Sequence, residues 1–175
     1  DIPAAAREVR IGGQAAGAFD ALMPDVRRVV AAAGTVPVSA FSLEALEAHA
    51  ATSGRPLADL LAALRDTGVA RVADAALDQL QRAERSIEQV RQAGLGLARL
   101  TVRHTASTAA RLEHIIGARS LQQSLGWIES FAPLGRLWEP GSPSTGYDDV
   151  RQVALARLLI DNIASIQVDR ARYGP

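Results

Sequence analysis

Cysteine is absent from all 175 residues of the chain. Its absence excludes disulfide bonds, thiolate nucleophiles, cysteine-ligated zinc sites and ordinary iron–sulfur clusters built from these residues alone. Lysine is absent as well, since the basic residues are all arginine, and this excludes a lysine Schiff base or nucleophile. No run approaches the roughly 18 consecutive apolar residues of a membrane span, and nothing resembles a signal peptide. We therefore expect no membrane partner and a cytoplasmic location.

An excess of either charge is missing too, because 19 basic residues balance 19 acidic ones. Without a net positive field, nothing draws nucleic acid or anionic lipid to the surface from a distance, and we expect no nucleic-acid partner. Apolar residues make up 48% of the chain and charged residues 22%, an ordinary globular composition. The length and composition predict one domain over residues 1–175.

Short β-branched runs alternate with longer amphipathic runs along the chain. The runs predict six strands, over residues 7–13, 36–41, 69–73, 97–104, 127–132 and 166–168. The intervening segments predict helices over residues 19–33, from 43, over 56–68 and 75–93, from 107 or 108, and from 145 to 162.

Consecutive strand–helix units predict an α/β fold, in which a parallel sheet of about six strands is covered by outer helices. The arrangement fits a partial or open TIM-type (β/α) barrel, because a complete barrel of eight strands takes about 250 residues. About two units are missing, so two sheet edges are expected to be left open, covered by something else or paired with another chain. We therefore expect a homo-oligomer or another protein partner.

Serine and histidine residues carry no catalytic pattern. Ser42 has no nearby base and is expected to cap the helix that follows it. His49 and His114 fall inside predicted helices, where a structural role is expected. The histidines have no metal-ligand spacing, and we expect no metal site.

Five segments share their order and spacing with a known family. They are the run RLEHIIGARSLQQSLGWIESFAPL at residues 111–134, VRIGG at 9–13, SAFS through TSG at 39–54, ARLLIDNIASIQ at 156–167, and His104 seven residues before the first of these. In these segments the chain resembles the radical-SAM enzymes of menaquinone and deazaflavin biosynthesis. The family includes dehypoxanthine futalosine cyclase, aminofutalosine synthase and the deazaflavin chromophore synthase, and the run DN-x₃-IQ resembles the cyclase in particular.

The resemblance implies a barrel whose first strand precedes a loop with three cysteines. That loop holds a [4Fe–4S] cluster, which cleaves S-adenosylmethionine to a radical. By the resemblance, these 175 residues begin at what would be the second strand, and we expect the first βα unit with its cluster loop to be absent from them. By the resemblance, S-adenosylmethionine and the cluster belong to the protein only if a segment lies upstream. No catalytic residue is assigned.

The resemblance also marks ligand-binding candidates at the ends of strands. Gly12 and Gly13 stand where the family's backbone approaches the amino group of S-adenosylmethionine, although a plain strand exit would use the same residues. His104, with Arg103 beside it, matches a strand-end histidine of the family, with a capping or surface role as the alternative. Ser42 completes this set.

Other positions depart from the family. Residues 72–80, VADAALDQL, lack its glycine run and glutamate, Ala106 replaces an acidic residue, and LGRLWEP at 134–140 replaces a proline-rich substrate loop.

The resemblance and these departures lead to three hypotheses about function. The chain is a cluster-free binding or partner protein that associates with itself or with an intact pathway enzyme. Alternatively, it is part of an active cyclase-like enzyme whose iron–sulfur segment lies upstream, or a scaffold for a nucleoside-like small molecule.

Overall fold

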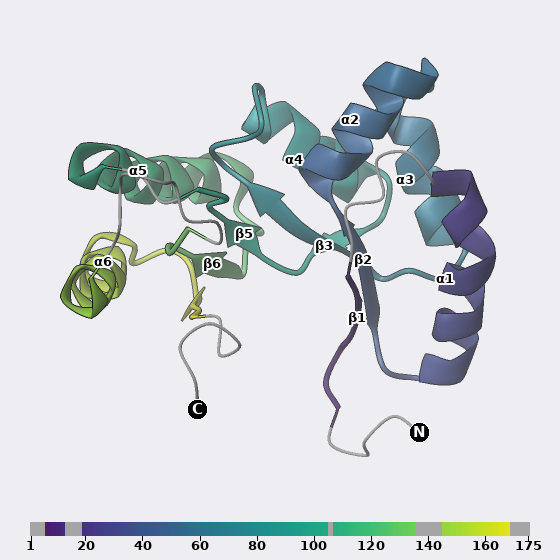
Figure 1. Ribbon diagram of the computed structural model, residues 1–175, viewed down its shortest axis with the longest axis horizontal. Coiled ribbons are helices and arrows are strands. Elements are labelled where there is room, and N and C mark those ends of the chain that lie inside the picture. Colours follow the sequence, from purple (N-terminus) through teal and green to yellow (C-terminus); the bar gives the residue numbers. More distant parts are fainter. Residues whose placement is uncertain (1–5, 13–18, 105–106, 136–144, 169–175) are drawn as a thin grey trace. The chain divides into compact units, whose positions relative to one another are not determined.

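A computed structural model of the protein describes residues 6–12, 19–104, 107–135 and 145–168 (Figure 1). The described residues form seven strands and six helices, and every strand pairing among them is parallel. The predicted α/β class with a parallel sheet is therefore confirmed. The pairing order is β1-β2-β3-β5-β6-β7, with β4 also paired to β3.

The chain divides into two compact units. The first unit is Asp1–Asp74 with Arg85–Ala98, and the second is Ala75–Glu84 with Arg99–Pro175. Strand β3 (Arg71–Ala76) therefore supplies residues 71–74 to the first unit and residues 75–76 to the second.

In the first unit, a parallel ladder runs from β1 through β2 to β3 and β4. Its elements are β1 (Val9–Ile11), α1 (Phe19–Ala33), β2 (Val38–Ser42), α2 (Leu43–Ser53), α3 (Leu57–Asp66), most of α4 (Ala83–Gln92) and β4 (Gly96–Leu97). The register pairs Val9 with Val38 and Ser42 with Asp74, so β1, β2 and β3 run in the same direction. Helices α1 and α2 pack against β2.

Leucines of α3 anchor the core of this unit. Leu60, Leu61 and Leu64 follow the i, i+1, i+4 spacing of one helix face and are fully buried. Burying each such side chain stabilises the fold by about 1.5–3 kcal/mol. The predicted helix over this segment is thus confirmed, with its apolar face inward.

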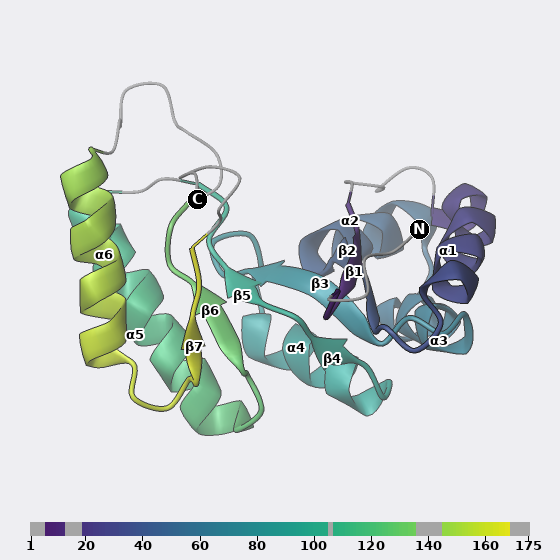
Figure 2. The same cartoon turned by 90° about the horizontal axis from the view of Figure 1, so that it is seen from below.

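In the second unit, β5 (Leu100–Thr101), β6 (Ser130–Ala132) and β7 (Ser165–Ile166) continue the parallel pairing from residues 75–76 of β3. Helices α5 (Thr108–Leu125) and α6 (Gly146–Leu159) lie side by side in Figures 1 and 2. Both helix starts match the prediction. Ser107 caps α5, and Thr145 with Asp148 forms a capping box at the start of α6.

The predicted helix over residues 75–93 is wrong at its start. Ala75 and Ala76 belong to β3, are fully buried and pair with Leu100 and Thr101, so that α4 begins only at Ala83. The high helix propensity of alanine is weaker than the gain from tertiary pairing and burial. The predicted strand over residues 97–104 is likewise two short strands, β4 and β5, separated at residues 98–99.

Across the described part of the chain, no helix combines the length and the apolar character needed to cross a membrane. The expected cytoplasmic location stays a prediction.

Candidate functional site

Polar side chains gather where the parallel strands end, which is the edge where α/β folds carry their binding and catalytic groups. Each unit has its own group. The first-unit cluster is Arg10, Ser42 and Asp74, with Gly12 at the end of β1. The second-unit cluster is Asp78, Gln79, Arg103 and His104.

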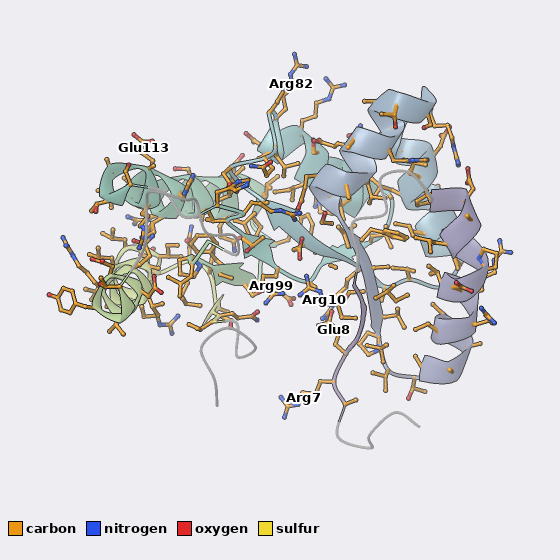
Figure 3. The ribbon with its side chains drawn as sticks, viewed as in Figure 1. Arg7, Glu8, Arg10, Arg82, Arg99 and Glu113 are labelled. Atoms are coloured by element: carbon orange, nitrogen blue, oxygen red, sulfur yellow. The ribbon has the colours of Figure 1, made fainter. Side chains whose placement is uncertain are left out.

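In the first-unit cluster, Arg10 lies on β1 and is labelled in Figure 3. It forms an ion pair with Asp74 near the end of β3. The same guanidinium lies 3.5 Å from the carbonyl oxygen of Ala73. The Asp74 side chain is 4% exposed, whereas that of Arg10 is 34% exposed. A carboxylate buried to this extent needs its partner, because an uncompensated buried charge costs several kcal/mol. Arg10 therefore supplies a charge partner for the buried carboxylate of Asp74.

Gly12 follows β1 directly, as predicted for a strand exit. A Cβ atom built at Gly12 would meet none of the described residues within 4 Å, so packing against them does not require glycine at this position. The space beside it is compatible with a ligand, and contact with one stays a prediction. Gly13 lies outside the described residues.

Ser42 ends β2 and caps α2. Its hydroxyl oxygen accepts a hydrogen bond from the backbone N–H of Ala45 at 3.4 Å, which confirms the predicted capping role. The preceding residue, Phe41, has a φ of +55°, an unusual value for a bulky side chain. Its ring packs on Phe19 with centroids 5.6 Å apart, a contact that helps to hold this turn. Whether Ser42 also binds a ligand stays a prediction.

In the second-unit cluster, Asp78 follows the end of β3, and Arg103 with His104 follows β5. The Asp78 Oδ1 atom accepts a hydrogen bond from the backbone N–H of Arg103 at 2.6 Å, and Oδ2 accepts one from the N–H of His104 at 3.0 Å. The Nδ1 atom of His104 lies 3.2 Å from the same Oδ2 atom. One carboxylate therefore bonds both the backbone and the imidazole ring of the neighbouring strand end.

The charge of Asp78 follows from these contacts. Burial raises the pKa of its carboxyl group, but hydrogen bonds from the backbone N–H groups of Arg103, His104 and Asp78 itself and from the Gln79 side chain together outweigh that effect. They hold the pKa below its ordinary value of 3.8. At neutral pH the imidazole thus stands beside a carboxylate. The His104 side chain is 38% exposed and that of Asp78 is 13% exposed, so the ring is the accessible member of the pair.

A histidine held by a carboxylate can accept or donate a proton, or hydrogen-bond a ligand, through its other ring nitrogen. The structure thus brings Arg103 and His104, two of the predicted residues, together with an unpredicted carboxylate. Asp78 was missed because the expected helix over residues 75–93 placed it on a helix. A strand extended to Ala76 would have put Asp78 at the strand exit beside His104.

No group of three or more histidine, cysteine, aspartate or glutamate side chains within the described ranges is placed to hold a metal ion. No family model matches the chain, and no curated protein matches it.

Proposed function

We propose that this chain is a cluster-free relative of the radical-SAM enzymes of menaquinone and deazaflavin biosynthesis that binds a nucleoside-like small molecule. In this proposal its strands belong to a partial or open TIM-type barrel, and its own residues carry out no radical chemistry. The observation that carries the proposal is the Asp78–His104 pair, a partly exposed imidazole held at the carboxyl ends of two parallel strands.

Two further features support a binding role. Gly12, at the end of β1, has no described residue within 4 Å of a Cβ atom built there, and the five family-like segments include both Gly12 and His104. The residues that depart from the family, such as Ala106 and residues 72–80 in β3 and after it, fall where the family does its chemistry. The 175 residues also contain no thiolate that could hold iron.

A ligand screen tests the binding role. We expect S-adenosylmethionine, adenosine or futalosine to raise the melting temperature of the full chain, because a ligand that binds the folded state stabilises it by mass action. The gain should disappear in His104→Ala and persist in His114→Ala, which removes the same ring from α5 instead. No shift with any of the three compounds would contradict the proposed ligand class.

A partner role is a second candidate, and the strand order favours it. In the described part of the first unit β1 pairs only with β2, and in that of the second unit β7 pairs only with β6. Unpaired strand edges invite another chain. Size-exclusion chromatography with light scattering should then show a homo-oligomer, or a complex when an intact pathway enzyme is added. A lone monomer under both conditions would count against this role.

The unpaired side of β1 also fits the alternative of an active enzyme, in which an upstream segment supplies the preceding strand and the cluster loop. Intact-mass measurement on the protein isolated from its source distinguishes the two. An additional segment with three closely spaced cysteines, together with brown colour after anaerobic reconstitution, would replace the cluster-free proposal.

A further inference from the structure

We infer that Asp78 positions His104 so that its Nε2 atom accepts a hydrogen bond from a hydroxyl or N–H group of the ligand. The inference rests on the proposed function and deepens it, because it names the residue that orients the histidine and the ligand chemistry that the histidine recognises. Asp78 is a positioning residue here, since it acts through His104.

Asp78 fixes the backbone that carries the ring. Its two carboxylate oxygens accept the N–H groups of Arg103 and His104 at 2.6 and 3.0 Å, so the position of the His104 main chain depends on this carboxylate. Hydrogen bonds to an ionised acceptor are about twice as strong as those between neutral groups. The strand exit is thereby held before any ligand arrives.

The same carboxylate selects the ring tautomer. The Nδ1 atom of His104 lies 3.2 Å from Oδ2 of Asp78, a distance at which an Nδ1–H group donates to the oxygen. The opposite tautomer would set the Nδ1 lone pair against a negatively charged oxygen. With the proton on Nδ1, a neutral imidazole has an accepting Nε2 atom.

The side chain of Gln79 also contacts Nδ1 of His104 and could favour the other ring tautomer. Its Nε2 atom lies 3.1 Å from Nδ1 of His104, and an amide donor there would favour a proton on the other ring nitrogen. That amide nitrogen also lies 3.3 Å from Oδ2 and 3.1 Å from the backbone oxygen of Asp78, two acceptors that it can satisfy instead. The negative charge of Asp78 acts on the ring more strongly than a neutral amide, so we assign control of the tautomer to Asp78.

The accepting nitrogen is open to a ligand. Within the described ranges, Nε2 of His104 takes part in no recorded hydrogen bond, and the side chain is 38% exposed. An acceptor recognises donor groups, which the ribose hydroxyls and amino groups of a nucleoside supply and a bare phosphate or carboxylate does not. The ligand class is therefore a hydroxyl- or amine-bearing small molecule.

Nitrogen-15 NMR of the ligand-free chain tests the tautomer directly. The chain has only three histidines, and the signals lost in His104→Gln identify those of His104. At mildly alkaline pH, where imidazoles are neutral, we expect the proton on Nδ1 in the wild type and in Gln79→Ala, and its loss from Nδ1 in Asp78→Asn. Asp78→Glu keeps the charge and should restore the wild-type pattern at least in part.

The NMR test of the tautomer and the ligand screen can fail independently of one another. A proton on Nε2 in the wild type, or a tautomer that changes in Gln79→Ala but not in Asp78→Asn, would overturn the inference while leaving the proposed function standing. Because this measurement needs no ligand, a failed ligand screen would remove the proposed function without altering the NMR result. Circular dichroism of each variant establishes that it folds.

Binding supplies the second readout. With adenosine as the probe, we expect Asp78→Asn to weaken affinity about tenfold, the loss that one misdirected hydrogen bond produces. The analogue 2′,3′-dideoxyadenosine lacks the 2′- and 3′-hydroxyls of the ribose but keeps the 5′-hydroxyl. If one of the two missing hydroxyls is the donor, the analogue should bind the wild type more weakly, and Asp78→Asn should weaken its binding much less than that of adenosine. Equal loss for both probes would assign the donor to the 5′-hydroxyl or to the amino group of the base rather than to the 2′- or 3′-hydroxyl.

Discussion

At the scale of single residues, Asp78 connects stability with the candidate site. It lies just beyond the end of β3 and makes hydrogen bonds to the backbone of the adjacent strand exit and to the His104 ring. A carboxylate in such a position is costly to remove, because its departure leaves donor groups without their partner. The residue that orders the site is therefore also one on which the local fold depends.

The lowered pKa of Asp78 predicts how stability depends on pH. Because the folded-state pKa lies below the ordinary 3.8, the folded state favours the ionised form. This contribution is fully present above the ordinary pKa and is lost as the pH falls through the lower, folded-state pKa. We expect Asp78→Asn to lower the free energy of unfolding by about 1–2 kcal/mol at neutral pH, and by less in acid.

Urea denaturation of the wild type and of Asp78→Asn at neutral pH and at acid pH measures this difference. Asp66→Asn serves as the control, because Asp66 is an exposed carboxylate that pairs with the adjacent Arg65. A difference between wild type and Asp78→Asn that stays constant over the acid range would contradict the prediction.

Gly68 allows a second prediction at the scale of residues, about the effect of an added side chain on stability. It has a φ of +94°, and a Cβ atom added there would lie 2.8 Å from Cγ1 of Val30, a β-branched side chain with few alternative rotamers. Gly34 has a φ of +60° but open space around the added atom. We expect Gly34→Ala to destabilise by about 1 kcal/mol, and Gly68→Ala by at least about 1 kcal/mol more because Val30 must move. Thermal or chemical denaturation of both variants measures the contrast, and equal losses would show that Val30 gives way freely.

At the scale of elements, α6 exposes several large apolar side chains and buries two polar ones, the reverse of an ordinary amphipathic helix. Tyr147, Val150 and Leu158 are 77%, 70% and 79% exposed, whereas Asp149 and Gln152 are buried. The apolar pattern predicted the existence of this helix correctly but did not identify its buried face.

Polar contacts with α5 explain the orientation of α6. Gln152 donates a hydrogen bond to the backbone oxygen of Arg111 at 3.1 Å, and an Asp149 oxygen lies 3.7 Å from the Arg111 guanidinium. The amide donor of Gln152 thereby has a hydrogen-bond partner and the Asp149 carboxylate has a charge partner, as buried polar groups require. The orientation of the helix is set by a partner that lies about 40 residues away in the sequence.

Two leucines test whether α3 and α6 differ in how much their apolar side chains contribute to stability. Leu61 in α3 is fully buried, and Leu158 in α6 is 79% exposed. We expect Leu61→Ala to lower the free energy of unfolding by about 2–5 kcal/mol, from lost burial and the cavity left behind. The same change at Leu158 should stay within about 0.5 kcal/mol. Chemical denaturation measures both, and a large loss at Leu158 would mean that its face is covered in solution.

At the scale of the whole molecule, the absence of cysteine gives the sharpest prediction. Anaerobic incubation of these 175 residues with ferrous iron and sulfide should leave a colourless protein after desalting, because no thiolate is present to hold a cluster. Iron and acid-labile sulfide are then quantified, with the protein-free mixture as the control. Iron and sulfide retained in stoichiometric amounts would contradict the cluster-free proposal.

Much of the local structure could be predicted from the sequence, because the signals that define it lie within a few residues of one another. The capping serine at Ser42, the capping box at Thr145 and the leucine spacing of α3 each predicted a feature that the structure contains. The parallel α/β class followed from the alternation of such segments. The candidate site was predicted in part, since His104 was placed at a strand end without its carboxylate.

What the sequence determined by itself is therefore local or compositional: the absence of thiolates and lysine, the starts of the helices and the alternation of strands with helices. Only the tertiary structure decided that Ala75 and Ala76 extend β3, that Asp78 meets His104, and which face of α6 is buried. The reason is physical. Each of these outcomes depends on pairing or burial between segments more than 20 residues apart, and such contacts outweigh the small local preferences that a sequence pattern expresses.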